Sequence, residues 1–131
     1  MSKEISGLNF PKFIGFAALA SILNALAFLV GKAADASMVV DQGGLRAIAF
    51  PMVLFATFVP LLLAGGVTQV IGKKNPSFIS KAAVIGGVFG VATFFAPFLV
   101  AQDGGTGVTL ASNHVIAGVL WFIGIKKSIK A

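Results

Sequence analysis

The sequence predicts an all-α fold, a bundle of four transmembrane helices with both termini in the cytoplasm. Four apolar runs of 18 to 25 residues divide the chain, and about 20 residues suffice to cross the hydrocarbon core of a bilayer. Only 11% of the 131 residues are charged, and the mean hydropathy is +0.99. A soluble domain normally carries about 25% charged residues, so the composition excludes a water-soluble globular protein. The sequence therefore predicts a protein whose main partner is the lipid bilayer.

Each run is predicted to be a helix, because a backbone surrounded by lipid has to satisfy its hydrogen bonds within the segment. The runs show none of the polar and apolar alternation of barrel strands. Asn9 and Asn75 shortly precede Pro11 and Pro76, and we expect both Asn side chains to cap the start of a helix. A single membrane domain is expected over residues 1–131, with helices at about 10–30, 47–71, 76–101 and 108–125.

The distribution of basic residues predicts the orientation of the bundle. Eight of the ten Lys and Arg residues flank the predicted helices on one side. Lys32 and Arg46 fall on the other side, with Asp35, Asp41 and Asp103. Basic residues are retained in the cytoplasm, so both termini are expected there and the protein in the cell (inner or plasma) membrane. The eight residues are Lys3, Lys12, Lys73, Lys74, Lys81, Lys126, Lys127 and Lys130.

The first apolar run has a second interpretation. Lys3 and Lys12 precede it and the sequence Ala34-Asp35-Ala36 follows it, which resembles a signal peptide with a small-residue cleavage site. The run is 18 residues long, however, and the apolar part of a signal peptide usually has about 7 to 15. We therefore favour a retained helix.

Small residues recur at helical spacing in two of the predicted helices. Ala17, Ser21 and Ala25 are four residues apart in the first helix, and Gly86 and Gly90 have GxxxG spacing in the third. Such residues let two helices approach closely. We expect them to pack helices together, and the spacing leaves open whether they do so within one bundle or across a dimer seam.

Two further features each leave several interpretations open. Pro51, Pro60 and Pro97 lie inside predicted helices, where they are either ordinary membrane-helix prolines or kinks, and a kinked second helix would open a cavity or act as a hinge. The loop over residues 31–46 is the largest exposed piece of the chain. It is an ordinary connector, a cap that folds back over the outer end of the bundle, or a segment that docks a partner.

Polar side chains inside the predicted spans form a candidate site. Asn24 and His114 each lie about 9 Å, and Thr93 about 12 Å, from the outer ends of their helices, so the three side chains share one layer of the bundle. An ionisable group inside a membrane is a functional candidate. Alternatively, a neutral His114 bonds Asn24 and only fixes the first helix against the fourth. The full candidate cluster is Ser21, Asn24, Thr57, Thr93, Asn113 and His114.

The composition excludes most kinds of catalytic and metal site. There is no Cys and only one His, so no metal site is predicted. The acidic residues fall outside the apolar runs, which argues against a Ser-His-Asp set and against proton-coupled antiport. No glycine-rich phosphate-binding motif occurs. No cofactor is predicted, and the net charge of +6 comes from lysines that flank the spans, so no nucleic acid partner is predicted.

Several of these residues also carry a resemblance to a known family. The chain resembles small actinobacterial membrane proteins that form domain-of-unknown-function family 6069, from about Ala17 to Ile125. It departs from that family in being rich in Lys and Phe, and in having Asn113 where members usually have Met or Leu. The resemblance implies the fold and a polar group within it, and it implies no activity. It rests on Asn24, Asp41-Gln42-Gly43-Gly44, Thr57, a basic turn, Pro97 and His114-Val115-Ile116-Ala117.

Two functions from different classes follow as hypotheses. The leading one is a non-enzymatic integral membrane protein, a structural or accessory component that packs with itself or with a larger membrane complex. The small-residue stripes and short loops favour it. The alternative is a homo-oligomeric channel or facilitator for a small solute, lined by the polar cluster. A membrane enzyme acting on lipid or quinone is least favoured, because His114 alone would have to supply the chemistry.

Overall fold

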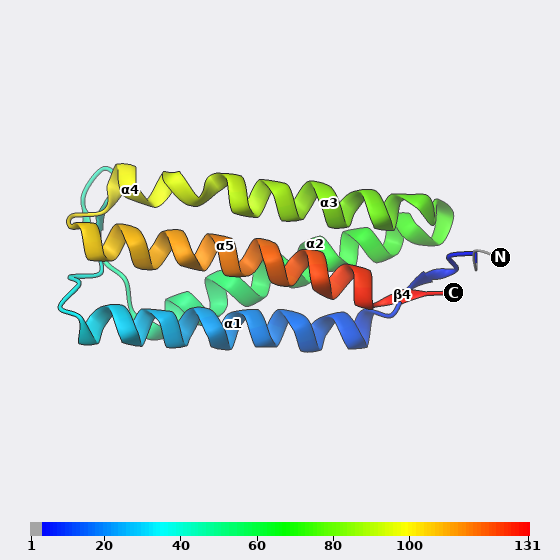
Figure 1. Cartoon of the computed structure of the whole chain (residues 1–131), viewed down its shortest axis with the longest axis horizontal. Coiled ribbons are helices and arrows are strands. Elements are labelled where there is room, and N and C mark those ends of the chain that lie inside the picture. The colour runs from blue at the N-terminus through cyan, green and yellow to red at the C-terminus, as the bar shows by residue number, and fades with distance from the viewer. Residues whose placement is uncertain (1–3) are drawn as a thin grey trace.

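Four long helical segments make up the structure, a computed structural model that describes residues 4–131 (Figure 1). Each segment is long and apolar enough to span a membrane, so the predicted number of spanning helices is confirmed. Lys3, counted above among the basic residues before the first helix, lies outside the described residues. The segments are α1 (Phe10–Ala33), α2 (Phe50–Lys74), a third segment (Ser77–Val100) and α5 (Gly104–Lys127).

The third segment is a broken helix, and Pro97 explains the break. Proline has no N–H to donate to the carbonyl of Thr93, and its ring crowds that carbonyl. The backbone tightens instead, so that the Ala96 N–H donates to the Thr93 carbonyl. The single helix predicted over 76–101 is therefore interrupted near its end. Its parts are α3 (Ser77–Ala92), the 3-10 turn η1 (Thr93–Phe95) and α4 (Ala96–Val100).

One of the two predicted helix caps is present and the other is not. Asn9 caps α1, because its Oδ1 accepts the backbone N–H of Lys12 at 3.2 Å. Asn75 does not cap α3. The connection between α2 and α3 is so short that Asn75 itself ends α2, and its side-chain oxygen accepts the Ser77 hydroxyl at 2.7 Å.

Glycines bring α3 and α5 into close contact. A Cβ added at Gly90 would stand 2.6 Å from the Cα of Gly118, and a Cβ added at Gly86 would overlap the side chain of Trp121. Both members of the GxxxG pair therefore lie against α5 within this chain. The small residues on α1 are also buried in the bundle: Ala17, Ser21 and Ala25.

Each end of the bundle carries a short two-stranded antiparallel sheet, which we did not predict. At the end that holds both termini, called the terminal end, β1 (Gly7–Leu8) pairs with β4 (Ile129–Lys130). At the opposite end, called the hairpin end, β2 (Val39–Asp41) pairs with β3 (Leu45–Ala47). Gly43, in the turn between them, has a φ of 81°, a left-handed conformation that favours glycine.

The main apolar core lies toward the terminal end, around Phe13 of α1 and Trp121 of α5. Their rings meet edge to face with centroids 5.4 Å apart. The indole N–H of Trp121 donates to the Ala82 carbonyl at 2.9 Å, so its one polar atom is satisfied although the side chain is buried. This core holds α1, α3 and α5 together, and a smaller buried cluster around Phe28 and Met38 lies at the hairpin end.

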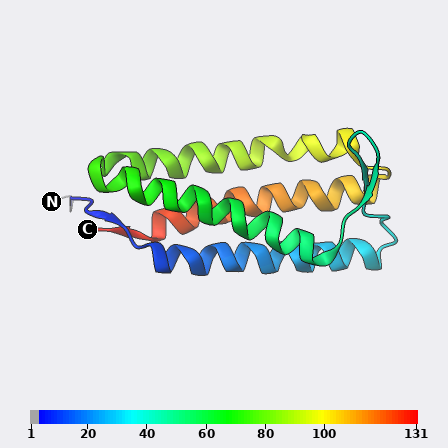
Figure 2. The ribbon, with the colours of Figure 1, turned by 180° about the vertical axis from the view of Figure 1, so that it is seen from behind.

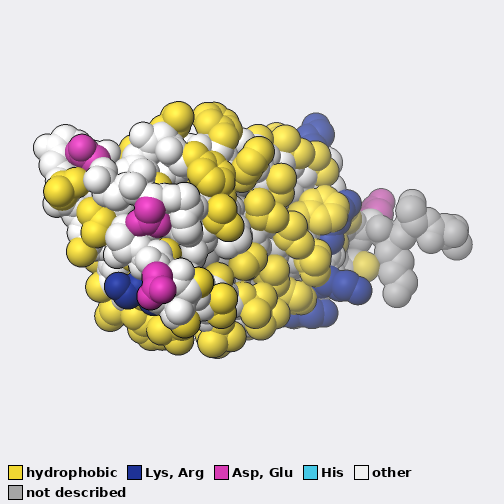
Figure 3. Space-filling model, turned by 60° about the vertical axis from the view of Figure 1, so that its left-hand side comes forward, with side chains coloured by type: hydrophobic (Ala, Val, Ile, Leu, Met, Phe, Trp, Pro, Cys, Tyr) yellow, Lys and Arg dark blue, Asp and Glu magenta, His cyan; other side chains and the backbone are white. Residues whose placement is uncertain are grey.

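Charged side chains gather at the two ends of the molecule. Figure 3 shows most of the Lys and Arg side chains, in dark blue, at the terminal end, acidic side chains in magenta mainly at the hairpin end with some dark blue beside them, and apolar surface between the two ends. The start of α1, the turn from α2 to α3 and the end of α5 all lie at the terminal end (Figure 1). The described lysines of the predicted cytoplasmic side therefore share that end: Lys12, Lys73, Lys74, Lys81, Lys126, Lys127 and Lys130.

Candidate functional site

A cavity of about 620 Å³ lies at the hairpin end, between α2 on one side and α4 and α5 on the other. It exists because α2 runs diagonally: it lies near α3 at the terminal end and leans toward α1 at the hairpin end (Figure 2). The hairpin β2–β3 contributes to its wall, and most of its lining is apolar. The polar lining residues are Asn24, Gln42, Arg46, Thr57, Asn113 and His114.

Asn24 of α1 ties three helices together in this cavity. The side chain is only 1% exposed. Its Nδ2 donates to the Oγ1 of Thr57 on α2 at 2.9 Å and to the backbone carbonyl of Asn113 on α5 at 3.1 Å. Hydrogen bonds between membrane helices typically contribute about 0.6 to 2 kcal/mol each, so this side chain helps to fix α2 where its contacts with α5 are few.

The Asn24 amide has one possible orientation, and it leaves an oxygen without a partner. The hydroxyl of Thr57 donates to the Val53 carbonyl at 2.8 Å, so Thr57 Oγ1 can only accept from Asn24. The Asn113 carbonyl can also only accept. Both contacts therefore require Nδ2, and Asn24 Oδ1 is buried with no hydrogen bond among residues 4–131.

A second acceptor in the same wall is unpaired. The Oδ1 of Asn113 is buried and has no hydrogen-bond partner within the described part of the chain. A buried polar atom that lacks its hydrogen bond costs about 1 to 3 kcal/mol, and native proteins contain few of them. Two residues of one cavity wall thus each carry a buried oxygen without a partner among residues 4–131.

His114 of α5 also lines the cavity, and its partner is Thr93 of η1. The Nδ1 of His114 lies 3.0 Å from Thr93 Oγ1, where one of our interpretations had named Asn24 as the partner. The break at Pro97 sets this pair, because it places Thr93 in the short 3-10 turn that packs against α5. Thr93 itself does not line the cavity.

The predicted polar cluster is therefore brought together in two tiers. Asn24, Thr57, Asn113 and His114 line the cavity. Thr93 contacts His114 but is not part of the cavity wall. Ser21 lies one turn of α1 away from Asn24 and donates to the Leu54 carbonyl at 2.8 Å. The last two hold the helices in register and do not face the cavity.

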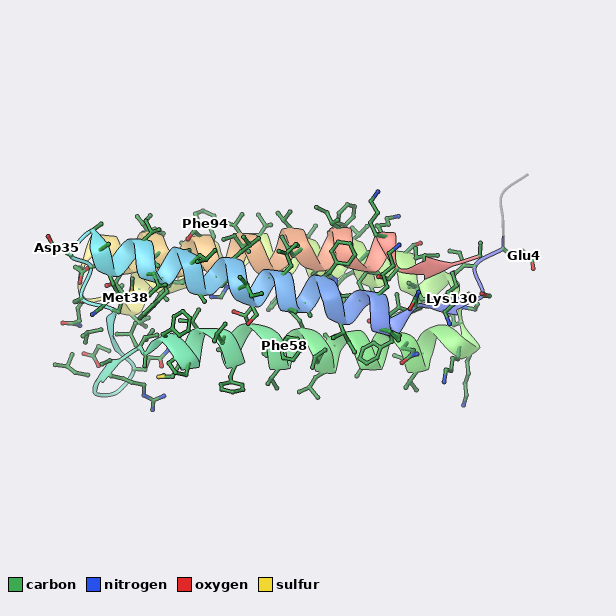
Figure 4. All side chains as sticks on the ribbon, turned by 90° about the horizontal axis from the view of Figure 1, so that it is seen from below. Glu4, Asp35, Met38, Phe58, Phe94 and Lys130 are labelled. Carbon is green, nitrogen blue, oxygen red and sulfur yellow. The ribbon has the colours of Figure 1, made fainter. Side chains whose placement is uncertain are left out.

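Sequence reasoning missed the contribution of the hairpin, which supplies Gln42 and Arg46 to the cavity wall. The signal was present, because Gly43-Gly44 stands between two short runs that contain Val, Leu and Ala, a pattern typical of a β-hairpin. Met38 and Asp35, labelled in Figure 4, mark this end of the molecule, opposite Glu4 and Lys130.

Hydrogen bonds attach the hairpin to the turn between α4 and α5. The N–H of Gln102 donates to the Val39 carbonyl at 3.0 Å, and the N–H of Met38 donates to Thr106 Oγ1 at 2.9 Å. Met38 is fully buried and has a φ of 55°, a conformation that non-glycine residues adopt only where surrounding contacts impose it. The loop over residues 31–46 thus folds against the bundle, as the cap interpretation expects.

Asp103 connects the hairpin loop to α5 through its carboxylate. One oxygen accepts the Thr106 N–H at 2.8 Å and caps α5, and the other accepts the Ser37 N–H at 3.1 Å. Hydrogen bonds from Ser37 and from the Thr106 backbone lower the pKa of Asp103 from 3.8 to about 2. The cap also explains why α5 begins at Gly104, before the predicted start at 108.

The chemistry of the cavity is that of a binding site. Its wall combines a cation and an amide at the hairpin with unpaired acceptors deeper in the bundle. Among residues 4–131, no three His, Cys, Asp or Glu side chains lie close enough to share a metal ion. A largely apolar pocket with a few convergent polar groups is the usual form of a small-molecule site.

Four segments that are long and apolar enough to span a membrane, with a largely apolar cavity between them, indicate a multi-pass membrane protein. The chain belongs to the family of unknown function DUF6069, whose family model matches residues 13–131. The predicted resemblance is thereby confirmed, and the matched range contains every residue that lines the cavity. No curated protein and no solved structure matches the chain.

Proposed function

We propose that this is a non-enzymatic integral membrane protein that binds a small, partly apolar molecule in the cavity between α2, α4 and α5. The observation that carries the proposal is a buried polar residue in the cavity wall, Asn24, whose Oδ1 has no partner within residues 4–131. The volume of about 620 Å³ lies within the range of about 300 to 1,000 Å³ that small-molecule sites have. This proposal keeps one part of the hypothesis of a channel or facilitator, namely that the protein binds a small molecule.

The accessory hypothesis keeps one observation in its favour. An apolar groove of about 450 Å³ runs along the outside of α3 and α5, between Val84, Val88, Val119 and Phe122. A helix of a second copy or of a larger membrane complex has a surface to pack on there. The support from the small-residue stripes is weaker, because Gly86 and Gly90 already pack against α5.

We also propose that the protein lies in the cell membrane with both termini in the cytoplasm. The support is that all described Lys residues except Lys32 gather at the terminal end (Figure 3). In this orientation the hairpin and the cavity belong to the outer half of the bilayer.

Native mass spectrometry of the protein, extracted in mild detergent from its own host membrane, tests the binding proposal. We expect a bound small molecule that survives extraction and is lost from Ala56→Phe, because Ala56 lines the cavity and a ring there takes up space that the molecule needs. Ala64→Phe is the matched control, since Ala64 is also exposed on α2 but lies two helical turns away from the cavity. Equal occupancy in both variants contradicts the proposal.

The same spectra separate the two candidate functions. A discrete homo-oligomer that retains the small molecule favours a channel or facilitator and justifies flux measurements. Stoichiometric co-purification with another protein, and no small molecule, favours the accessory role. A bare monomer without any adduct contradicts both.

A further inference from the structure

One face of the β2–β3 hairpin is turned to the cavity. The residues of this segment that line the cavity occupy alternate positions along the chain. Alternate residues of a strand point to the same face, and residues directly opposite each other on paired strands share a face. Val40 and Arg46 are such a pair. The four residues of this cavity face are Val40, Gln42, Arg46 and Ile48.

The same alternation separates the charges of the hairpin. Arg46 lies on the cavity face, and among the described residues it is the only charged one in the cavity wall. Asp41 is paired with Leu45, one position further along, and therefore points to the opposite face. Its carboxylate accepts the backbone N–H of Gly44 at 3.0 Å. The cavity wall thus presents a guanidinium group without any carboxylate of the described chain beside it.

Most of the remaining wall suits an apolar chain. α2 contributes Met52, Val53 and Ala56, and α4 contributes Leu99 and Val100. Arg46 is exposed, so its charge stays hydrated at the end of the bundle and avoids the cost of burying a charge in the membrane. A molecule in the cavity therefore meets a cation at the hairpin and mainly apolar side chains along the helices.

We propose that the ligand of the cavity is a single-chain anionic amphiphile, whose oxyanion pairs with Arg46 and whose apolar chain lies between α2 and α4. This inference rests on the proposed binding function. A guanidinium group holds a carboxylate or phosphate through two parallel hydrogen bonds, and the amide of Gln42 adds a donor on the same face of the hairpin. A cationic amphiphile meets a like charge at this position.

Direct binding of two matched probes tests the charge pairing. The probes are radiolabelled decanoate and decanol, which have the same chain length and differ in the charge of the head group. Their binding to the immobilised full chain in a non-ionic detergent is measured by scintillation proximity at about pH 8, where a carboxylic acid is ionised. Ala56→Phe, which reduces the space in the cavity, identifies the binding that belongs to the cavity.

We expect both probes to bind saturably. Arg46→Gln is expected to weaken decanoate binding about tenfold, the loss of a charge-assisted pair, and to leave decanol binding unchanged. Lys32→Gln is the matched control, because Lys32 is the other basic residue at the hairpin end and does not line the cavity. It removes the same charge and is expected to bind both probes like the parent.

The variants distinguish failure of the ligand class from failure of the binding function. Equal decanoate affinities in the parent and in Arg46→Gln, with binding that still depends on Ala56, overturn the anionic class and leave binding in the cavity standing. Equal losses in Arg46→Gln and Lys32→Gln indicate general attraction to the hairpin end and overturn the pairing with Arg46. No binding of either probe that depends on Ala56 overturns the binding function itself.

A second substitution covers the case in which Arg46→Gln displaces the hairpin and both probes are lost. Arg46→Lys retains the positive charge and is expected to recover part of the decanoate binding. Recovery of decanol binding without recovery of decanoate binding overturns the pairing.

Discussion

Thr57 and Thr68 of α2 are chemically alike and differ in one contact. Both are buried, and each hydroxyl donates to the carbonyl four residues earlier, at 2.8 Å. Only Thr57 also accepts from another helix, through Asn24. The pair therefore offers a matched measurement of what the contact across helices contributes.

Thr57→Val is expected to lower the free energy of unfolding by about 1 kcal/mol more than Thr68→Val, because it removes one interhelical hydrogen bond from the membrane interior. Valine keeps the shape of threonine in both variants. Reversible unfolding in mixed detergent micelles measures the difference. Equal losses in the two variants indicate that the bond from Asn24 adds nothing to stability.

Asp103 makes stability depend on pH in a defined direction. Because its pKa is about 2 in the folded protein and 3.8 ordinarily, the carboxylate form favours the folded state. This contribution is fully present above the ordinary value and is lost as the pH falls toward about 2. Asp103→Asn is expected to be less stable than the parent at about pH 7, with a difference that narrows below about pH 4. Thermal unfolding in detergent across this range checks it, and a constant difference contradicts it.

At the scale of residues, the sequence predicts how deep a side chain lies along its helix. It does not predict the direction in which the helix points that side chain. Counting residues placed Asn24, Thr93 and His114 in one layer. The pairing within that layer depends on which way each helix turns its side chains. Asn24 turns to Thr57, and Thr93 turns to His114. The rotation of η1 follows from the break at Pro97, which a regular helix wheel does not contain.

At the scale of elements, the contact of α3 with α5 depends on glycines. The two helices lie so close at these positions that there is no room for a side chain. A Cβ at Gly118 would stand 2.8 Å from the Val91 backbone nitrogen and 3.0 Å from the Gly87 carbonyl oxygen. Backbone atoms cannot move aside as a flexible side chain does. Gly118→Ala therefore has to push the two helices apart.

We expect Gly118→Ala to lower the free energy of unfolding by about 1 to 3 kcal/mol, the usual cost of overpacking. Gly66→Ala is the control, because a Cβ at Gly66 of α2 meets nothing within 4 Å. That variant is expected to gain up to about 1 kcal/mol from the helix preference of alanine. Unfolding in mixed micelles measures both, and a neutral Gly118→Ala shows that α3 and α5 adapt without cost.

The elements themselves were predictable to different degrees. The four spanning segments follow directly from apolar runs, which dominate the energetics of a chain in lipid. The strands β2 and β3 are only three residues each, and their stability comes from contacts such as the Gln102 N–H on the Val39 carbonyl. Such contacts join distant parts of the chain, and local sequence does not reveal them.

At the scale of the whole molecule, the proposed orientation is directly measurable. The chain has no Cys, so Leu45→Cys in the hairpin and Lys127→Cys at the end of α5 each introduce one thiol. A membrane-impermeant thiol reagent is expected to label the first in intact cells and the second only after permeabilisation. The reverse pattern contradicts the proposed cytoplasmic termini.

The tilt of α2 is the global feature that the sequence did not predict. Two sets of contacts with α1 set this tilt. Gly65 packs closely on Phe13, where a Cβ would overlap the ring. Nearer the hairpin end, Asn24 and Ser21 of α1 donate hydrogen bonds to α2. The apolar residues on all sides of α2 carry no preferred face that would indicate the angle. The cavity arises from that angle, so its volume was not predictable, although several residues of the predicted polar cluster do line it.

The diagonal course of α2 also determines how a molecule meets the cavity. The hairpin is bonded over the end of the bundle, whereas the wall includes Met52 of α2 and Leu99 of α4, which are 41% and 78% exposed. We therefore expect a molecule to enter sideways, between α2 and α4, from the side of the bundle that would face the acyl chains. A compound that dissolves well in the bilayer has a local concentration at this opening between α2 and α4 that is far above its concentration in water. If the cavity binds small molecules as proposed, affinities for a homologous series of apolar compounds, expressed per aqueous concentration, should rise with chain length in parallel with their membrane partition coefficients, even where the contacts with the protein stay the same.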